Sequence, residues 1–167
     1  MKPADIALGL GALALALILG ALGFQYIAHM PPCEMCHWQR WPLIAAAILG
    51  IPGGLFAKRD DRAAFWLALL VILLVAVSGA IGVDQAGVEW KWWAGPQECS
   101  GALEDLGSAG GLLNKLQSIS VVRCDDAAWR FLGLSLAGYN VLISLALAAV
   151  AAWASMLEWR QLRAGNF

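Results

Sequence analysis

Long stretches without a charged side chain are the feature that most limits how this chain can fold. Four such runs cover residues 6–28, 41–57, 63–83 and 131–157. Ionised side chains are strongly disfavoured in the hydrocarbon core of a bilayer. A helix rises about 1.5 Å per residue, so about 20 residues cross a core of about 30 Å. Three runs are long enough, and the run 41–57 suffices if its helix begins near Cys33 with polar first turns in the interface.

We therefore predict an all-α membrane protein, a four-helix transmembrane bundle with a long extracytoplasmic loop between helices three and four. The chain, residues 1–167, forms a single integral membrane domain. The predicted helices cover about 6–28, 34–57, 63–83 and 131–157, and the predicted extracytoplasmic loops cover about 29–33 and 84–130. In the second helix, Pro42 should introduce a kink and Pro52-Gly53-Gly54 should end the helix.

The composition agrees with a membrane location. Hydrophobic residues make up 60% and charged residues 14% of the chain, and these are too few charges to coat a soluble globule of this size. The net charge of −1 gives no basic surface for nucleic acid. A cleaved signal peptide is an alternative for the first run, but its apolar stretch is long, Asp5 weakens a basic leader and no small-x-small cleavage site follows. Retention as a membrane anchor is therefore expected.

The distribution of cations predicts the orientation. One side of the predicted bundle carries Lys2, Lys58, Arg59, Arg62, Arg160 and Arg163, so this side, with both termini, should face the cytoplasm. The opposite side carries most of the tryptophans expected of an interfacial belt: Trp38, Trp41, Trp90, Trp92, Trp93 and Trp129. All four cysteines, Cys33, Cys36, Cys99 and Cys124, also lie on that side, where disulfides can form and persist.

Cys33 and Cys36 form a C-x-x-C motif at the start of the second predicted helix, directly after two prolines. A helix N-terminus favours a thiolate because its backbone amides and dipole present positive charge. Arg40 stands four residues after Cys36, on the same helix face, and a permanent cation there should stabilise the thiolate further. Arg40 can also be an anchor that extends its charge to the lipid headgroups, and the two roles are compatible.

Two structural alternatives remain for the cysteines. The C-x-x-C could form part of a metal site with His29 and His37, although Cys99 and Cys124 are too far apart to complete usual zinc-ligand spacing. A bond between Cys99 and Cys124 could be a structural staple. The segment between them is rich in glycine, which favours an exposed loop suited to thiol exchange. Its leucines at near-helical spacing fit either the bilayer surface or packing on the bundle.

The chain resembles the DsbB family of disulfide bond formation proteins. The resemblance is carried by CEMCHWQR at residues 33–40, GVEWKWWAGP at residues 87–96 and CDDAAWRFLGLS at residues 124–135. Two cysteine pairs at these topological positions, with an arginine four residues after the second cysteine, rarely occur together by chance. The resemblance extends over essentially the whole chain.

This resemblance implies a thiol oxidase of the bacterial inner membrane. Such an enzyme reoxidises a DsbA-type thioredoxin-fold oxidase in the periplasm and passes the electrons to a membrane quinone, ubiquinone or menaquinone. By position, Cys99 would be attacked by the partner thiolate and Cys124 released. Cys124 would then exchange with Cys33, leaving Cys36 as a thiolate that faces the quinone. Arg40 would hold both that thiolate and a quinone oxygen.

The sequence departs from the family at two places. Gln85 stands where many members carry a histidine near the quinone, and glutamine can donate a hydrogen bond but cannot titrate. A proton would then come from water, His37 or Glu89. Gln39 stands where an acidic residue often accompanies the arginine.

The sequence leaves the resting disulfide open, with Cys124 bonded to either Cys99 or Cys33. The related family of vitamin K epoxide reductase-like proteins also has four helices and two cysteine pairs, but its C-x-x-C generally lies late in the chain. A different class is a non-catalytic membrane protein with structural disulfides or a Cys/His metal site.

Overall fold

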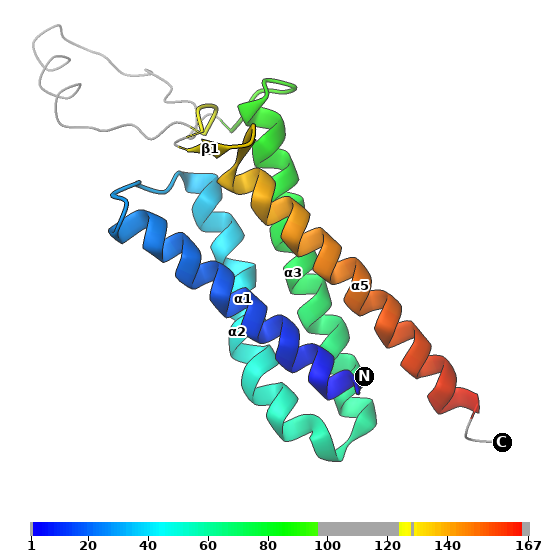
Figure 1. Cartoon of the computed structure of the whole chain (residues 1–167). Coiled ribbons are helices and arrows are strands. Elements are labelled where there is room, and N and C mark those ends of the chain that lie inside the picture. Colours follow the sequence, from blue (N-terminus) through cyan, green and yellow to red (C-terminus); the bar gives the residue numbers. More distant parts are fainter. Residues whose placement is uncertain (1, 97–123, 128, 165–167) are drawn as a thin grey trace, which may run out of the picture.

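The computed structural model describes residues 2–96, 124–127 and 129–164, with the side chains of Arg59 and residues 161–164 excepted. This part of the chain folds into an antiparallel bundle of four long helices (Figure 1). The helices are α1 (Pro3–Tyr26), α2 (Glu34–Phe56), α3 (Asp61–Glu89) and α5 (Leu136–Ala164). Three of them, α1, α3 and α5, are long and apolar enough to cross a membrane. The predicted all-α membrane fold is therefore confirmed, although α2 is not among the helices that meet this criterion of length and composition.

The end of α2 differs from the prediction, because Pro52-Gly53-Gly54 does not end the helix. Pro42 and Pro52 both lie inside α2, which continues to Phe56 before the short 3₁₀ helix η1 (Ala57–Arg59). The glycines are needed for packing instead. A Cβ atom on Gly54 would lie 2.8 Å from the Ala4 carbonyl oxygen of α1. The close approach of two helices, rather than a turn, explains the glycine at this position.

The third helix is longer than predicted and the fourth begins later. α3 runs to Glu89, so Gln85 and Glu89 lie one turn apart on its last two turns rather than in the loop. α5 begins only at Leu136 because residues 130–135 form a hairpin, β1 (Arg130–Phe131) paired antiparallel with β2 (Leu134–Ser135). Its two turn residues, Leu132 and Gly133, both have positive φ, as a tight hairpin turn requires. A charge-free stretch does not distinguish hairpin from helix.

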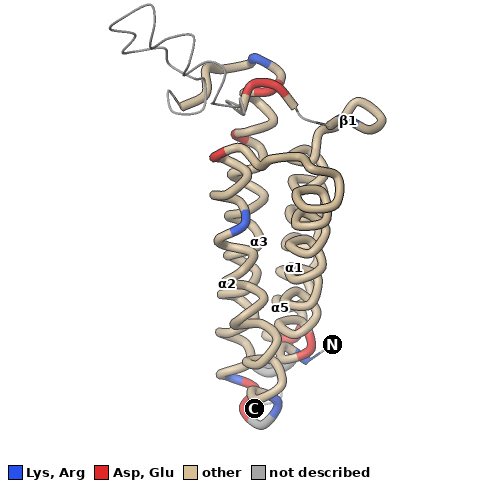
Figure 2. The backbone as a smooth tube through the Cα atoms, turned by 90° about the vertical axis from the view of Figure 1, so that its left-hand side faces the viewer, with Lys and Arg blue, Asp and Glu red and all other residues tan. Residues whose placement is uncertain are grey.

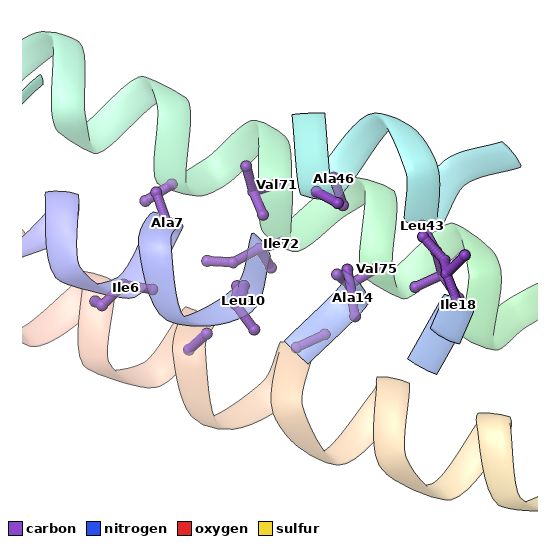
Figure 3. Packing of buried hydrophobic residues seen from close by; sticks show 14 residues of the cluster. Ile6, Ala7, Leu10, Ala14, Ile18, Leu43, Ala46, Val71, Ile72 and Val75 are labelled. Atoms are coloured by element: carbon purple, nitrogen blue, oxygen red, sulfur yellow. The ribbon is translucent and has the colours of Figure 1, made fainter. Parts of the chain in front are cut away.

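Small residues bring α1 and α2 into close contact. A Cβ atom on Gly11 would lie 2.8 Å from the backbone nitrogen of Ile51, and one on Gly50 would lie 2.6 Å from the Ala7 carbonyl oxygen. Around this contact, buried aliphatic side chains from α1, α2, α3 and α5 form the core shown in Figure 3. They include Ile6, Ala7, Leu10, Ala14 and Ile18 of α1, Leu43 and Ala46 of α2, and Val71, Ile72 and Val75 of α3.

Charged residues gather toward the two ends of the bundle, and a blue stretch on α2 lies between them (Figure 2). The N-terminal end of α1, the connection between α2 and α3 and the C-terminal end of α5 lie together at one end (Figure 1). The α1–α2 connection, the end of α3 and the hairpin lie at the other. This second end carries Cys33 and Cys36, and we refer to it as the cysteine end.

Candidate functional site

Two free thiols lie at the N-terminus of α2. Cys33 is the N-cap residue of the helix and is buried, and Cys36 is half-buried in the first turn. The backbone N–H of Cys36 donates to Cys33 Sγ over 3.3 Å, so the helix start that the sequence predicts directs a backbone amide at a sulfur atom. The fixed φ of the two preceding prolines suits this extended entry into a helix.

Cys124 lies against this pair. It is buried, and it packs in one cluster with Cys33, Met35 and Val88. Unlike the pair on α2, Cys124 is disulfide-bonded. Because Cys33 is free, the structure does not contain the Cys33–Cys124 bond that the sequence left open. Cys99 lies outside the described residues, and its predicted role stays a prediction.

Gln85 connects α3 to both thiols. Its Nε2 lies 3.4 Å from Cys33 Sγ, 3.4 Å from Cys36 Sγ and 3.1 Å from Oε1 of Glu89. Its Oε1 accepts a hydrogen bond of 2.5 Å from Gln39 Nε2. The amide is therefore held in one orientation by α2, and that orientation presents its N–H groups to the sulfur atoms.

The two sulfur atoms are in different electrostatic situations. The pKa of the Cys33 thiol is raised far above its ordinary value, first by its hydrogen bond with the Cys36 side chain and then by burial. Cys33 is thus the member that keeps its proton. Cys36 has the Gln85 amide beside it and Arg40 one turn further along α2, groups that stabilise a thiolate. The surroundings of the pair therefore favour the proton on Cys33 and negative charge on Cys36.

Arg40 does not bind the thiols directly in this structure. Its guanidinium donates to Gln25 Oε1 over 2.6 Å and approaches the Ala21 carbonyl oxygen at 3.5 Å, so it is fixed to α1. Both acceptors are neutral, which leaves the positive charge uncompensated by these contacts. The side chain also lines the cavity described next, and its charge is available there.

A cavity of about 490 Å³ adjoins the thiols. Its walls are mostly apolar and come from α1, α2, α3, α5 and the segments that precede α2 and α5. Polar groups line it where it meets the pair: Cys33, Cys36, Gln39, Arg40, Gln85, Glu89 and Asn140. Phe24, Trp129 and Tyr139 form aromatic contacts at the same cavity. A mostly apolar pocket with a few convergent polar groups is the usual form of a small-molecule site.

Three of the polar residues that line the cavity beside the thiols were not included in the site predicted from sequence. Asn140 bridges helices, donating to Gln39 Oε1 over 2.7 Å and to Ser78 Oγ over 3.1 Å. It also lines the cavity, as do Gln39 and Glu89. Gln39 could have been found from helical spacing, since it lies four residues from the buried Met35 and four from the buried Leu43.

Metal binding was the main structural alternative for the cysteines. Within the described residues, no three histidine, cysteine, aspartate or glutamate side chains come close enough to hold a metal ion. His29 and His37 are both exposed, and neither lines the cavity.

Replacing Gln85 with leucine should slow the reaction of Cys36 with iodoacetamide at neutral pH by about tenfold, because a hydrogen bond to a charged group is worth about 1.5–3 kcal/mol. Mass spectrometry of the alkylated protein would follow each thiol separately. Asp84→Leu is the matched control, since Asp84 is the neighbour of Gln85 on α3 but is exposed and does not line the cavity. An unchanged rate in Gln85→Leu would show that the amide does not stabilise the thiolate.

The fold and the site together define a multi-pass helical membrane protein with a buried C-x-x-C dithiol at one end of the bundle. The family model described as disulfide bond formation protein DsbB matches residues 3–154. The chain belongs to the DsbB family, whose members are disulfide oxidoreductases of membranes. The family resemblance found in the sequence is therefore confirmed.

Curated relatives agree with this assignment. The chain is 32% identical over 149 residues to disulfide bond formation protein B of Aromatoleum aromaticum, a match that covers 86% of each chain. It is 30% identical over 164 residues to the protein of the same name from Dechloromonas aromatica, covering 94% of this chain and 92% of the relative. No solved structure gives a significant match.

Proposed function

We propose that this protein reoxidises a DsbA-type dithiol protein of the periplasm and passes the electrons to a membrane quinone, ubiquinone or menaquinone. The observation that carries the proposal is the cavity beside Cys36. It places an apolar space of about 490 Å³, a sulfur atom and a guanidinium group at one spot within a membrane bundle.

The residues of the cavity fit a quinone head group. Apolar walls suit the ring, and Arg40 and the Gln85 amide can donate hydrogen bonds to carbonyl oxygens. α1 and α5 both contribute wall residues, among them Leu17, Ala21 and Ile143, so the isoprenoid tail can leave between two helices toward lipid. A bound quinone would accept the two electrons that the thiol pair gives up when it forms a disulfide.

The chain's own groups prepare the dithiol for this reaction. Cys36, with the Gln85 amide and Arg40 near it, is the sulfur that faces the cavity as a thiolate. Cys33 keeps its proton and is packed against Cys124. This contact supports an exchange in which Cys124, released when the partner attacks Cys99, attacks the Cys33–Cys36 disulfide at Cys33. This attack bonds Cys33 to Cys124 and releases Cys36 as a thiolate. When the second thiol of the partner frees Cys99, attack of Cys99 on Cys124 would restore the Cys99–Cys124 disulfide and release Cys33, which leaves the pair reduced as it is in this structure.

The cysteine end should face the periplasm. Lys2, Lys58 and Arg62 lie at the opposite end of the bundle, and an excess of cations marks the cytoplasmic side. An oxidising compartment at the cysteine end would allow the disulfide of Cys124 to persist. A partner in the periplasm could reach that end directly.

Mixing the purified protein in detergent with a reduced DsbA-type protein and a short-chain ubiquinone tests the proposal. We expect the ubiquinone absorbance to fall in proportion to the partner dithiol that is oxidised, one quinone for each dithiol. Loss of partner thiols without any change in the quinone, or no loss of thiols, would overturn the proposal.

A further inference from the structure

Glu89 is a buried carboxyl group whose hydrogen bonding is incomplete. Only 6% of the residue is exposed, and it lines the cavity beside the thiols. Its Oε1 accepts from Gln85 Nε2, but its Oε2 has no hydrogen-bond partner among the described residues. An ionised carboxylate with one oxygen unpaired in an apolar enclosure is costly, whereas the neutral acid costs less and can donate a proton.

The carboxyl group also lies close to the thiol pair. One atom, Gln85 Nε2, is within hydrogen-bond distance of Glu89 Oε1 and of both sulfur atoms. Negative charge on the Glu89 carboxyl group and on the Cys36 sulfur atom at the same time is costly here, because both groups contact the same amide nitrogen in a buried site and like charges repel.

The other ionisable groups at the cavity are less suited than Glu89 to hold and release a proton beside the Cys36 thiolate. They are Cys33, Cys36, Arg40, Asp126 and Tyr139. The hydroxyl group of Tyr139 already donates its hydrogen to the Phe131 carbonyl oxygen over 3.0 Å. The two cysteines are the reacting groups, and an arginine side chain does not deprotonate in proteins. Asp126 is exposed, so its charge is hydrated and the proximity of a thiolate affects it less. Of the candidates from sequence, His37 is exposed and lies outside the cavity lining.

We propose that Glu89 is the general acid of this site: it holds a proton while Cys36 is a thiolate and releases that proton when the pair is oxidised. This inference rests on the proposed function, in which a quinone is the acceptor. Oxidation forms the Cys33–Cys36 bond, breaks the Cys33 S–H and the Glu89 O–H bonds, and passes two electrons and two protons to the acceptor. Full reduction of a quinone requires this same number of each, so no further proton source is needed in the step.

The first test needs no quinone. Reduced and oxidised dithiothreitol set the dithiol and disulfide forms of the protein, and an infrared difference spectrum compares them. We expect the dithiol form to have a band of a protonated carboxyl group that is lost on oxidation. The band should disappear in Glu89→Gln and remain in Asp84→Asn, which makes the same substitution at an exposed carboxylate on α3. Glu89→Asp should retain a shifted band. A band that persists in Glu89→Gln, or no carboxyl band in the wild type, would overturn the proposal.

The second test separates the two halves of the reaction. Glu89→Gln keeps the oxygen that accepts from Gln85, and it should exchange thiols with the reduced partner at the wild-type rate while short-chain ubiquinone is reduced about 100-fold more slowly. A change in ubiquinone reduction of less than about twofold would contradict a general-acid role. If the wild-type protein itself does not reduce ubiquinone, the proposed function fails, but the infrared result still decides where the proton resides.

Discussion

Replacing Cys36 with serine is expected to reduce electron transfer to a quinone to the uncatalysed rate. The hydroxyl group of serine cannot form the disulfide that releases two electrons, and no other free thiol among the described residues adjoins Cys33. The measurement is ubiquinone absorbance with a reduced DsbA-type partner. In the same reaction Cys33 has no partner on α2, so we expect its disulfide with Cys124 to accumulate and to be visible by non-reducing mass spectrometry.

The matched control for this variant is His37→Gln. His37 is the next residue on α2 but is exposed and does not line the cavity, so its replacement should leave the turnover rate unchanged. Full turnover by Cys36→Ser would remove the thiolate from the proposed reaction. Loss of activity in His37→Gln alone would point to the imidazole as the proton carrier that we assign to Glu89.

Two glycines of α1 should respond to alanine with opposite signs. Gly11→Ala places a methyl group 2.8 Å from the Ile51 backbone nitrogen, and because backbone cannot rotate away, we expect a loss of about 1–3 kcal/mol in the free energy of unfolding. Gly9→Ala meets no atom within 4 Å and should gain up to about 1 kcal/mol from helix propensity. Unfolding in mixed micelles, followed by circular dichroism, would measure both.

The comparison of these two variants tests the packing of α1 against α2 and is insensitive to general effects of alanine in a lipid environment. Equal stability changes at Gly9 and Gly11 would mean that the helices do not approach as closely as the structure places them. Activity is a further readout. Arg40 is held by Gln25 and Ala21 of α1, so Gly11→Ala should also change the position of the guanidinium relative to the cavity.

Helix number and membrane location could be predicted because they depend on a long-range average, the absence of charge over about 20 residues. The ends of the helices depend on local contacts that such an average does not contain. Pro52-Gly53-Gly54 resembles a helix end, yet the tight contact of Gly54 with α1 explains the glycine. Residues 131–135 carry no charge but form most of a hairpin, because positive φ at Leu132 and Gly133 reverses the chain.

In the candidate site, the residues with distinctive chemistry were identified from sequence and those with ordinary chemistry were not. The C-x-x-C, Arg40 and Gln85 were found by motif and resemblance. Asn140 joins the site through a contact with Gln39, 101 positions away in the chain, which no local pattern indicates. Glu89 could be named from sequence as a proton source. Its burial and its one unpaired oxygen could not be predicted, because they depend on the extension of α3 to residue 89.

The polar side chains that begin at the thiols continue into the bundle: Gln85 binds Gln39, Gln39 binds Asn140, and Asn140 accepts from Ser144 over 2.9 Å. This connection ties the oxidation state of the cysteines to the packing of three helices. The disulfide form and the dithiol form can differ in their free energy of unfolding. Thermodynamic linkage requires that the reduction potential of the pair in the folded protein then differs from its value in the unfolded chain by the same free energy. A difference of about 1.4 kcal/mol corresponds to about 30 mV. Substitutions at Asn140, far along the chain from either cysteine, are thus a means to adjust the potential of the pair.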